Sequence, residues 1–340
     1  MRGRFILTPL TPPNKGWLDP ECPRWASGCA AAAGQRGRIP DLTFVGVSSV
    51  SDGCPVRSGT LFDCASLTKP LVTAALVRAL GVPADEPLQF PPPHTPYPLG
   101  TPTVAQALVH AAGMPRWLPV YGLASDREQA LCLLPGRQTA PPGSATEYSC
   151  PGFILLGRWL ELQTGRTLPD LALEYLLRPL NLEGEAFFPF AGQVPLERVA
   201  ATELGNRIER EMAGGAAEER PSPIRGEVHD GNARFLGGAA GNAGLFATAR
   251  AVFRLAEQAW DLPGHPLAPG SFWNGWKAGG AGTCFPDGAL GHTGFTGTSV
   301  CLHLKEDAIS VLLTNRLHRE NPPDLFELRK RFHAEAPNSV

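Results

Sequence analysis

The sequence lacks a long hydrophobic run and a large net charge. In the first 16 residues, MRGRFILTPLTPPNKG, only Phe5, Ile6 and Leu7 form a continuous apolar segment, which is too short for a secretory signal or a membrane span. No later stretch reaches membrane length, so we expect a cytoplasmic protein with no membrane partner. The formal net charge of −2 gives no electrostatic reason to expect nucleic-acid binding.

The eight cysteines include no C-x-x-C pair. Their spacing suits neither a zinc site nor a compact disulfide framework, so we expect no metal and no other cofactor. In a reducing compartment, most of these cysteines are expected to be small buried hydrophobic residues.

Hydrophobic residues make up 43% of the 340 residues and charged residues 18%, which allows a sizeable core. The 35 prolines and 38 glycines predict many turns and short elements. We therefore expect one large domain, or two that are closely joined.

Strand patterns lie near both ends of the chain. Residues 42–50, LTFVGVSSV, are apolar and β-branched, and residues 298–316 read as two strands around a turn at 305–307. We therefore expect an α+β fold, with one sheet assembled from both ends of the chain and a helical middle inserted between them. The expected boundaries are about 1–80 plus 245–340 for the sheet subdomain and about 81–244 for the helical subdomain.

Apolar residues at helical spacing predict several helices between and after these strands. Gly81 marks the end of the first one, and Pro322 and Pro323 are predicted to open the last. Residues 181–240 are expected to be rich in loops. The predicted helices are 66–81, 103–113, 151–165, 168–180, 244–260 and 321–336.

Ser66 and Lys69 stand at positions i and i+3, so they share one face of the first predicted helix. The positive end of the helix dipole would favour an anion at Ser66. A lysine desolvated beside the serine can lose its charge and accept the seryl proton. The structural alternative is a capping serine followed by a solvated lysine, because the S-x-x-K pattern alone is common.

Two distal stretches favour the catalytic interpretation of Ser66 and Lys69. Tyr148, in EYSCPGF, precedes a predicted helix, and a phenol beside an ammonium can serve as a general base or proton shuttle. Residues 291–298, GHTGFTGT, have glycines that let the backbone approach a ligand. Taken alone, the tyrosine would be a packing residue and the glycine-rich stretch a turn.

The order S-x-x-K, Y-x-x, [KH]-T-G resembles the serine β-lactamase and penicillin-binding-protein superfamily, and most closely its class C-like branch of esterases and D-amino-acid peptidases. The resemblance spans residues 60–316, through blocks such as TVAQALVHAAGMP, GEVHDGNARFLGGAAGNAGLFATA and LLTNR. It implies a β-lactamase/transpeptidase-like fold, in which helices flank a mostly antiparallel sheet and a helical domain lies across the cleft. It also implies that Ser66 is the acylated nucleophile, Lys69 its base partner and Tyr148 the residue that passes protons to and from the leaving group.

On the substrate side, the resemblance assigns His292, Thr293 and Gly294 to a Lys-Thr-Gly strand. The oxyanion hole would consist of the backbone N–H groups of Ser66 and Phe295. In this chain a histidine near its titration point replaces the lysine, and Cys150, a weak hydrogen-bond donor, stands where the family usually has an amide. The N-terminal region is short for a family that builds two strands and a helix there, so we expect a trimmed sheet edge.

The roles of three further residues stay open. Arg316 could hold a substrate carboxylate through two parallel hydrogen bonds, or it could form a surface ion pair. His229 and Asp230, in GEVHDGN, could be metal ligands, but adjacent side chains point apart. We therefore favour a structural loop near the cleft.

The leading hypothesis is a serine hydrolase that forms an acyl-enzyme with short esters, small amides or peptides. The second is β-lactam hydrolysis or D-alanyl peptide cleavage. The non-enzymatic alternative is a family member that has lost turnover and only binds its substrate. A fourth hypothesis is a thiol hydrolase with Cys150 or Cys64 as the nucleophile. The sequence does not indicate an oligomeric state.

Overall fold

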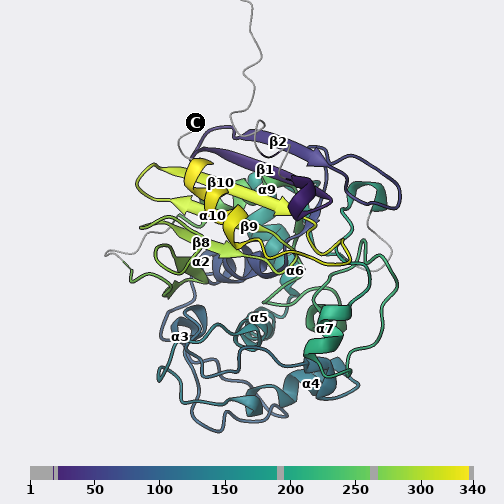
Figure 1. Cartoon of the computed structure of the whole chain (residues 1–340). Helices are drawn as coiled ribbons and strands as arrows, with labels where there is room; N and C mark the ends of the chain where they lie inside the picture. Colours follow the sequence, from purple (N-terminus) through teal and green to yellow (C-terminus); the bar gives the residue numbers. More distant parts are fainter. Residues whose placement is uncertain (1–17, 19–21, 190–194, 261–266, 337–340) are drawn as a thin grey trace, which may run out of the picture.

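A large antiparallel sheet dominates the structure, a computed structural model that describes residues 18, 22–189, 195–260 and 267–336 (Figure 1). The described residues form seven strands in the order β2-β1-β10-β9-β8-β7-β6. β1 pairs with β10, so the two ends of the chain meet in one sheet, as the sequence predicts. The strands are β1 Gly28–Gln35, β2 Asp41–Gly46, β6 Phe272–Trp273, β7 Trp276–Ala278, β8 Leu290–Thr293, β9 Ser299–His303 and β10 Ala308–Thr314.

Helices cover both faces of this sheet, and a helical region lies beyond it in Figure 1. A second small sheet, in the order β3-β5-β4, contains the strand that leads to Ser66. Its strands are β3 Phe62–Asp63, β4 Ala186–Phe187 and β5 Phe246–Ala247. The α-helices are α2 Ala75–Ala79, α3 Val104–Leu108, α4 Arg127–Leu133, α5 Cys150–Thr164, α6 Leu168–Ala172, α7 Arg207–Met212, α8 Gly231–Phe235, α9 Ala249–Gln258 and α10 Phe326–Glu335. The predicted α+β fold, with helices flanking an antiparallel sheet, is confirmed, whereas the exact subdomain boundaries stay a prediction.

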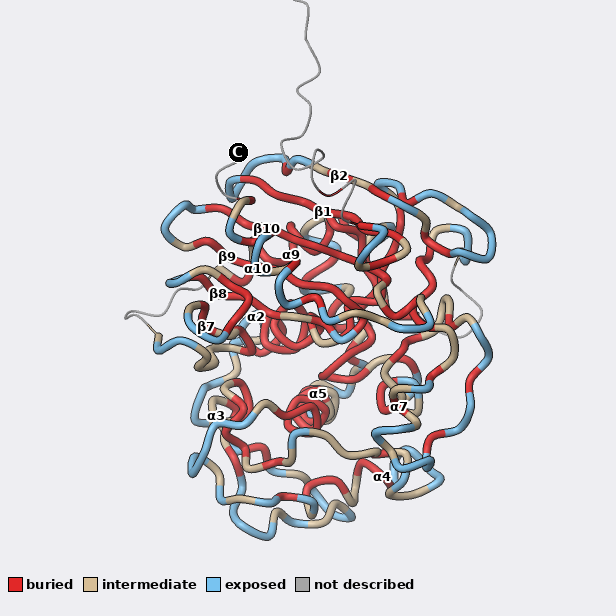
Figure 2. Tube along the Cα trace, in the orientation of Figure 1, coloured by how far each residue is buried: buried red, intermediate tan, exposed pale blue. Residues whose placement is uncertain are grey.

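β1 is buried on both faces, because it lies between β2 and β10 with helices on either side (Figure 2). Ala30 and Ala32 face the main core, while Ala31 and Ala33 pack in a second core with α10. The expected trimmed sheet edge is wrong, since the N-terminal region supplies two paired strands, β1 and β2. The small side chains allow close packing on both faces.

The helix that carries Ser66 and Lys69 is confirmed, and it is not uniform. A 3₁₀ turn spans Ala65–Leu67 and a wider π-helical segment spans Lys69–Ala74, before the chain continues into α2. Gly81 follows the helix with a φ of +64°, a backbone conformation that favours glycine. π-Helical segments are frequent at functional sites.

Several boundaries differ from the prediction, and the strand predicted over 42–50 ends at Gly46 as β2. α3 ends at Leu108, because His110 takes a left-handed conformation with a φ of +59°. β5 precedes α9 within the range predicted as one helix. α10 begins at Phe326, beyond the two prolines predicted to open it.

No helix among the described residues is both long enough and apolar enough to span a bilayer. The short apolar segment near the N-terminus, for which we predicted no signal and no membrane span, lies outside the described residues. Free thiols are present at Cys54, Cys64, Cys132, Cys150, Cys284 and Cys301, and all but the first and third of these are buried.

Candidate active site

Ser66 follows β3 directly, on a turn whose backbone is strained. Ala65 has a φ of +47°, which a residue other than glycine rarely adopts. The buried carboxyl group of Asp63 holds this turn: it accepts hydrogen bonds from the Ala65 N–H at 2.8 Å and from the His229 N–H at 2.7 Å. Burial raises the pKa of Asp63. The turn presents Ser66 at the start of the helix, where the first N–H groups have no partner within the helix.

Lys69 is completely buried, and its ammonium group has three acceptors. Its Nζ lies 3.0 Å from Ser66 Oγ, 3.2 Å from the Asn242 carbonyl oxygen and 3.4 Å from Cys150 Sγ. A protonated lysine has three N–H donors, so each of these three acceptors can receive one hydrogen bond. Burial alone lowers the pKa of Lys69, but the charges that Cys150 and Tyr148 can carry outweigh burial and raise the pKa above its usual value. The role of Lys69 as the base that accepts the Ser66 proton stays a prediction.

Tyr148 completes a three-residue group with Ser66 and Lys69. Its hydroxyl donates to Ser66 Oγ at 2.9 Å, and its ring lies 5.0 Å from Lys69 Nζ. Burial raises the pKa of the phenol, although the Lys69 charge opposes this shift. The His110 ring packs against the Tyr148 ring at 4.8 Å, and His110 Nδ1 accepts from the Ser149 N–H. Tyr148 is thus fixed by its neighbours as well as by Ser66.

β8 and the turn at residues 294–298 form the opposite wall of the site. Thr296 donates through its hydroxyl to the Asp63 carbonyl at 2.7 Å, and Thr298 to the Cys64 carbonyl at 3.1 Å, so this turn is bonded to the turn before Ser66. His292 Nδ1 donates to the Thr293 carbonyl at 2.9 Å. Burial, followed by the Lys69 charge, lowers the pKa of His292 to about 3. At neutral pH the site therefore has no cation at His292.

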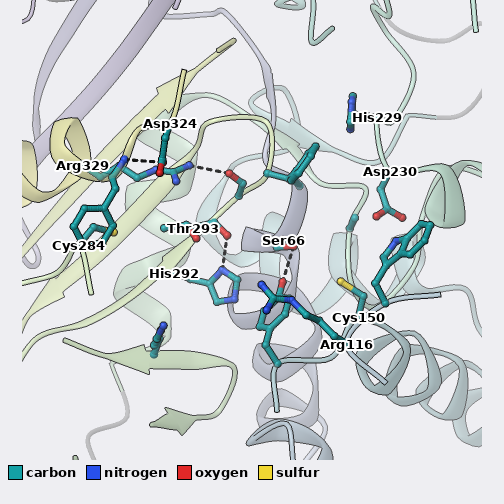
Figure 3. A pocket seen from close by; sticks show the side chains of 18 of the residues that line it. Ser66, Arg116, Cys150, His229, Asp230, Cys284, His292, Thr293, Asp324 and Arg329 are labelled. Carbon is teal, nitrogen blue, oxygen red and sulfur yellow. Dashed lines mark hydrogen bonds between the residues drawn. The ribbon is translucent and has the colours of Figure 1, made fainter. Parts of the chain in front are cut away.

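These walls enclose a pocket of about 670 Å³. In Figure 3, Ser66 lies between Asp324 and Arg329 at one end and His229 and Asp230 at the other. Lys69 lies behind Ser66, outside the pocket lining. The other residues predicted for the site all line the pocket: Ser66, Tyr148, Cys150, His292, Thr293, Gly294, Phe295 and Arg316.

The cysteines proposed as alternative nucleophiles differ in position. Cys64 is fully buried, and burial raises the pKa of its thiol well above the usual value, which makes it unreactive. Cys150 lies at the start of α5 with its sulfur toward Lys69, in a position from which an amide side chain could reach the pocket.

Arg316 has its guanidinium group occupied by the main chain. Nε and Nη2 donate to the Phe295 carbonyl at 3.2 and 3.1 Å, and Nη1 donates to the Pro323 carbonyl at 2.8 Å. Within the described residues it makes no ion pair, so the surface ion-pair interpretation is not supported. These bonds also leave few donors for a substrate carboxylate.

The contacts of His229 and Asp230 support a structural loop. His229 Nε2 bonds to the buried Glu203 carboxyl group, and Asp230 caps α8 through the Ala233 N–H. Neither residue belongs to a group of possible metal ligands within the described residues.

The possible metal ligands lie elsewhere, between the sheet and α10. Cys301, His303 and His333 place their ligand atoms within 4.8 Å of one another. His303 Nε2 and His333 Nδ1 both bond to Ser310 Oγ at 2.7 Å, and His333 Nε2 bonds to Ser299 Oγ at 2.9 Å. Hydroxyl groups therefore already occupy three of the four ring nitrogens. We refer to these five residues as the histidine–serine cluster.

Sequence analysis missed four residues that shape the site: Asp63, His110, Asn242 and Arg329. Asp63 and His110 act on the main chain beside Ser66 and Tyr148, and Asn242 offers Lys69 a carbonyl group. Such roles depend on backbone conformation, which residue types alone do not reveal. The one available signal was the position of His110 within the block TVAQALVHAAGMP, which carries part of the family resemblance.

A protein-family model described as Beta-lactamase matches residues 21–333 of the chain. Among curated proteins, a putative D-alanyl-D-alanine carboxypeptidase of Escherichia coli (strain K12) is 28% identical, over 80% of this chain and 74% of the relative. An N-acetylmuramyl-L-alanine amidase of Bacillus subtilis (strain 168) is 30% identical, over 54% of this chain and 48% of the relative. The chain thus spans about half the length of this second relative.

Solved structures with the same fold cover nearly the whole chain. D-amino acid amidase from Ochrobactrum anthropi SV3, in complex with D-phenylalanine, has a TM-score of 0.70 and 19% identity over 96% of this chain and 98% of its own. A class C β-lactamase from Rhodobacter sphaeroides has a TM-score of 0.69 and 19% identity over 95% and 98%. EstCE1, described as a hydrolase with promiscuous acyltransferase activity, has a TM-score of 0.66 and 20% identity over 92% and 95%. At these identities the likeness concerns the fold alone.

Proposed function

This chain belongs to the Beta-lactamase family, and from that membership we propose that it is a serine hydrolase whose Ser66 forms the acyl-enzyme. The observation that carries the proposal is the convergence of Lys69 Nζ and Tyr148 OH on Ser66 Oγ, at 3.0 and 2.9 Å, at the wall of a pocket. A nucleophile needs a proton acceptor within hydrogen-bond distance, and this arrangement supplies two candidates.

The acylation step requires the Lys69–Tyr148 pair to lose one proton. In the resting state both groups hold their protons, because the pKa of each is raised. Once the pair has lost a proton, it can accept the Ser66 proton while Oγ attacks the substrate carbonyl carbon. Tyr148 then returns a proton to the leaving group, and the same pair activates the water that hydrolyses the acyl-enzyme. The proton is shared by the pair, so no single pKa belongs to either residue.

The tetrahedral intermediate would be held by the N–H groups of Ser66 and Phe295. The Phe295 N–H has no acceptor among the described residues. Preorganised donors of this kind stabilise the negative charge as it develops on the substrate oxygen.

We propose short esters and small amides as the preferred substrates over β-lactams. A β-lactam presents a carboxylate that a fixed cation meets best, but His292 is neutral and Arg316 is bonded to main-chain carbonyls. It also presents an amide, for which Cys150 offers only a weak partner. A site without buried polar partners discriminates against substrates that need them, often by about a hundredfold.

Cleavage of a D-alanyl peptide is the second candidate function. Arg116 lines the same pocket as Ser66 and Tyr148 and could meet a terminal carboxylate. Similarity to the putative D-alanyl-D-alanine carboxypeptidase also supports D-alanyl peptide cleavage as a candidate function.

The test compares kcat/KM for p-nitrophenyl butyrate, nitrocefin and a D-alanyl-D-alanine peptide. Mass spectrometry after a fluorophosphonate probe should locate the adduct on Ser66. We expect the ester to be the best substrate, and Cys150→Asn to raise the nitrocefin rate relative to the ester rate. Faster turnover of nitrocefin by the unmutated protein would contradict the ester preference. D-alanine release as the fastest reaction would favour the second candidate, and a probe adduct without turnover would identify a binding protein.

A further inference from the structure

Arg329 joins the C-terminal helix to the wall of the active site. It lies on α10, lines the pocket, and appears in Figure 3 at the end away from Asp230. Its Nη2 donates to two main-chain carbonyls, that of Gly294 at 2.8 Å and that of Thr298 at 2.9 Å. No sequence motif indicates this contact.

The Gly294 carbonyl and the Phe295 N–H are the two ends of one peptide group. Resonance couples them, because the C–N bond has partial double-bond character. A cation that donates to the carbonyl oxygen draws electron density from the nitrogen and makes its N–H a stronger donor, and hydrogen bonds in a chain strengthen one another in this way. We propose that Arg329 is a positioning residue that polarises and orients the Phe295 N–H toward the oxyanion. This inference rests on the oxyanion hole of the proposed function.

The turn is already closed without Arg329. Gly294 donates its N–H to the Thr298 carbonyl at 2.7 Å, and Gly297 donates its N–H to the Gly294 carbonyl at 3.1 Å. Two threonine hydroxyls also anchor this turn to the residues before Ser66. Removing the guanidinium should therefore leave the fold of the turn in place, while it removes a positive charge from the oxyanion peptide.

Arg329 keeps its charge at neutral pH. Burial lowers the pKa of its guanidinium to about 10, which is still well above 7. The hydrogen bond to Gly294 is therefore charge-assisted under ordinary assay conditions.

Arg316 provides a matched comparison on the same turn. It also donates to a main-chain carbonyl, but that carbonyl belongs to Phe295 and is coupled to the N–H of Thr296. Thr296 is not a proposed oxyanion donor. Both arginines hold the turn, whereas only Arg329 acts on the peptide that points to the oxyanion.

The experiment measures kcat and KM for p-nitrophenyl butyrate in Arg329→Gln, Arg329→Lys and Arg316→Gln. Direct loss of an oxyanion donor costs on the order of a hundredfold to a thousandfold in kcat, so weakening one should cost about tenfold. We expect that loss in Arg329→Gln with KM nearly unchanged, partial recovery in Arg329→Lys, and a loss at least threefold smaller in Arg316→Gln. The affinity for phenylboronic acid, which forms a tetrahedral adduct with a serine, should fall in parallel with kcat.

Equal losses in the two glutamine variants, an effect confined to KM, or unchanged boronic-acid affinity would overturn the inference. Should Arg329→Gln not fold, as judged by circular dichroism and Tm, Arg329→Met decides by the same criteria, because it also removes the charge: an unchanged kcat would then overturn the inference. A failure of the proposed function looks different, because hydrolysis would survive in Ser66→Ala and the fluorophosphonate would not label Ser66.

Discussion

Two clusters in this molecule place serine hydroxyls against nitrogen bases. One is the group of Ser66, Lys69 and Tyr148, and the other is the histidine–serine cluster between the sheet and α10. In the second, Ser310 Oγ lies 2.7 Å from a ring nitrogen of each of two histidines, which is closer than Lys69 lies to Ser66. A search for serine–base pairs by distance alone would rank the histidine–serine cluster first.

The surroundings distinguish the two clusters. Ser310 is completely buried, whereas Ser66 lines a pocket of about 670 Å³. Burial lowers the pKa of His303 to about 4 and that of His333 well below its usual value, so both rings are neutral. The pKa of Lys69, by contrast, is raised, so its ammonium group is charged at neutral pH. The comparison teaches that a serine–base contact alone does not mark a nucleophile, and that access to a pocket is what favours Ser66 in the proposed function.

The largest expected effect comes from replacing Ser66 or Lys69 with alanine. Ser66→Ala should abolish hydrolysis of p-nitrophenyl butyrate, and Lys69→Ala should be nearly as severe, because members of one proton-transfer unit do not act additively. Steady-state rates above the buffer blank provide the measurement, with circular dichroism as the folding control. Residual activity of Ser66→Ala close to that of the unmutated protein would exclude Ser66 as the nucleophile.

Tyr148→Phe should give the next largest effect. The change removes one hydroxyl and little volume, so a loss in kcat of about a hundredfold or more would reflect proton transfer rather than packing. An unchanged kcat would return Tyr148 to a packing role beside His110.

The pH dependence separates the charged cluster from the neutral one. Because the pKa values of Lys69 and Tyr148 are both raised, the form of the pair that has lost one proton is scarce at pH 7 and becomes more abundant as the pH rises. We expect kcat/KM for the uncharged ester to increase toward alkaline pH, by up to about tenfold per pH unit below the pKa of the pair. Rates corrected for spontaneous hydrolysis give the profile, and a rate that falls over this range would disprove the charge assignment.

The smallest effect on activity should come from Ser310→Ala. Loss of this hydroxyl leaves one nitrogen on each of two buried histidines without a partner, which should lower the free energy of unfolding by about 1–3 kcal/mol. Urea denaturation measures that loss, and kcat for the ester should stay within about twofold of the unmutated value. A large fall in kcat in a fully folded Ser310→Ala variant would mean that the histidine–serine cluster takes part in the reaction.

The sequence predicts well those features that depend on residue type and order. The two late strands, the helix with Ser66 and Lys69, and α5 with Gly165 after it all carry local signals, and the structure confirms them. β1 was missed because GCAAAAGQ has neither alternation nor β-branched residues. A strand buried on both faces needs neither, since both of its sides pack against other elements.

Some features of the site could likewise be predicted from the sequence, and others could not. The motifs predicted which residues line the pocket, but not how their charges are distributed. The raised pKa of Lys69 results from Cys150 and Tyr148, which lie about 80 residues away in the chain. The bonds of Arg316 and Arg329 end on backbone carbonyls, whose positions depend on the folded turn. Such contacts could not be read from residue spacing.

The place of β1 in the sheet has a consequence for how the protein is made. Ala32 pairs with Val311, and no other strand separates β1 from β10. A ribosome adds about 5–20 residues per second, so β1 waits on the order of tens of seconds before its partner emerges. Contacts of such long sequence separation also slow folding. During synthesis the alanine-rich strand has only β2 to pair with, and this interval is when the nascent chain would benefit most from a chaperone.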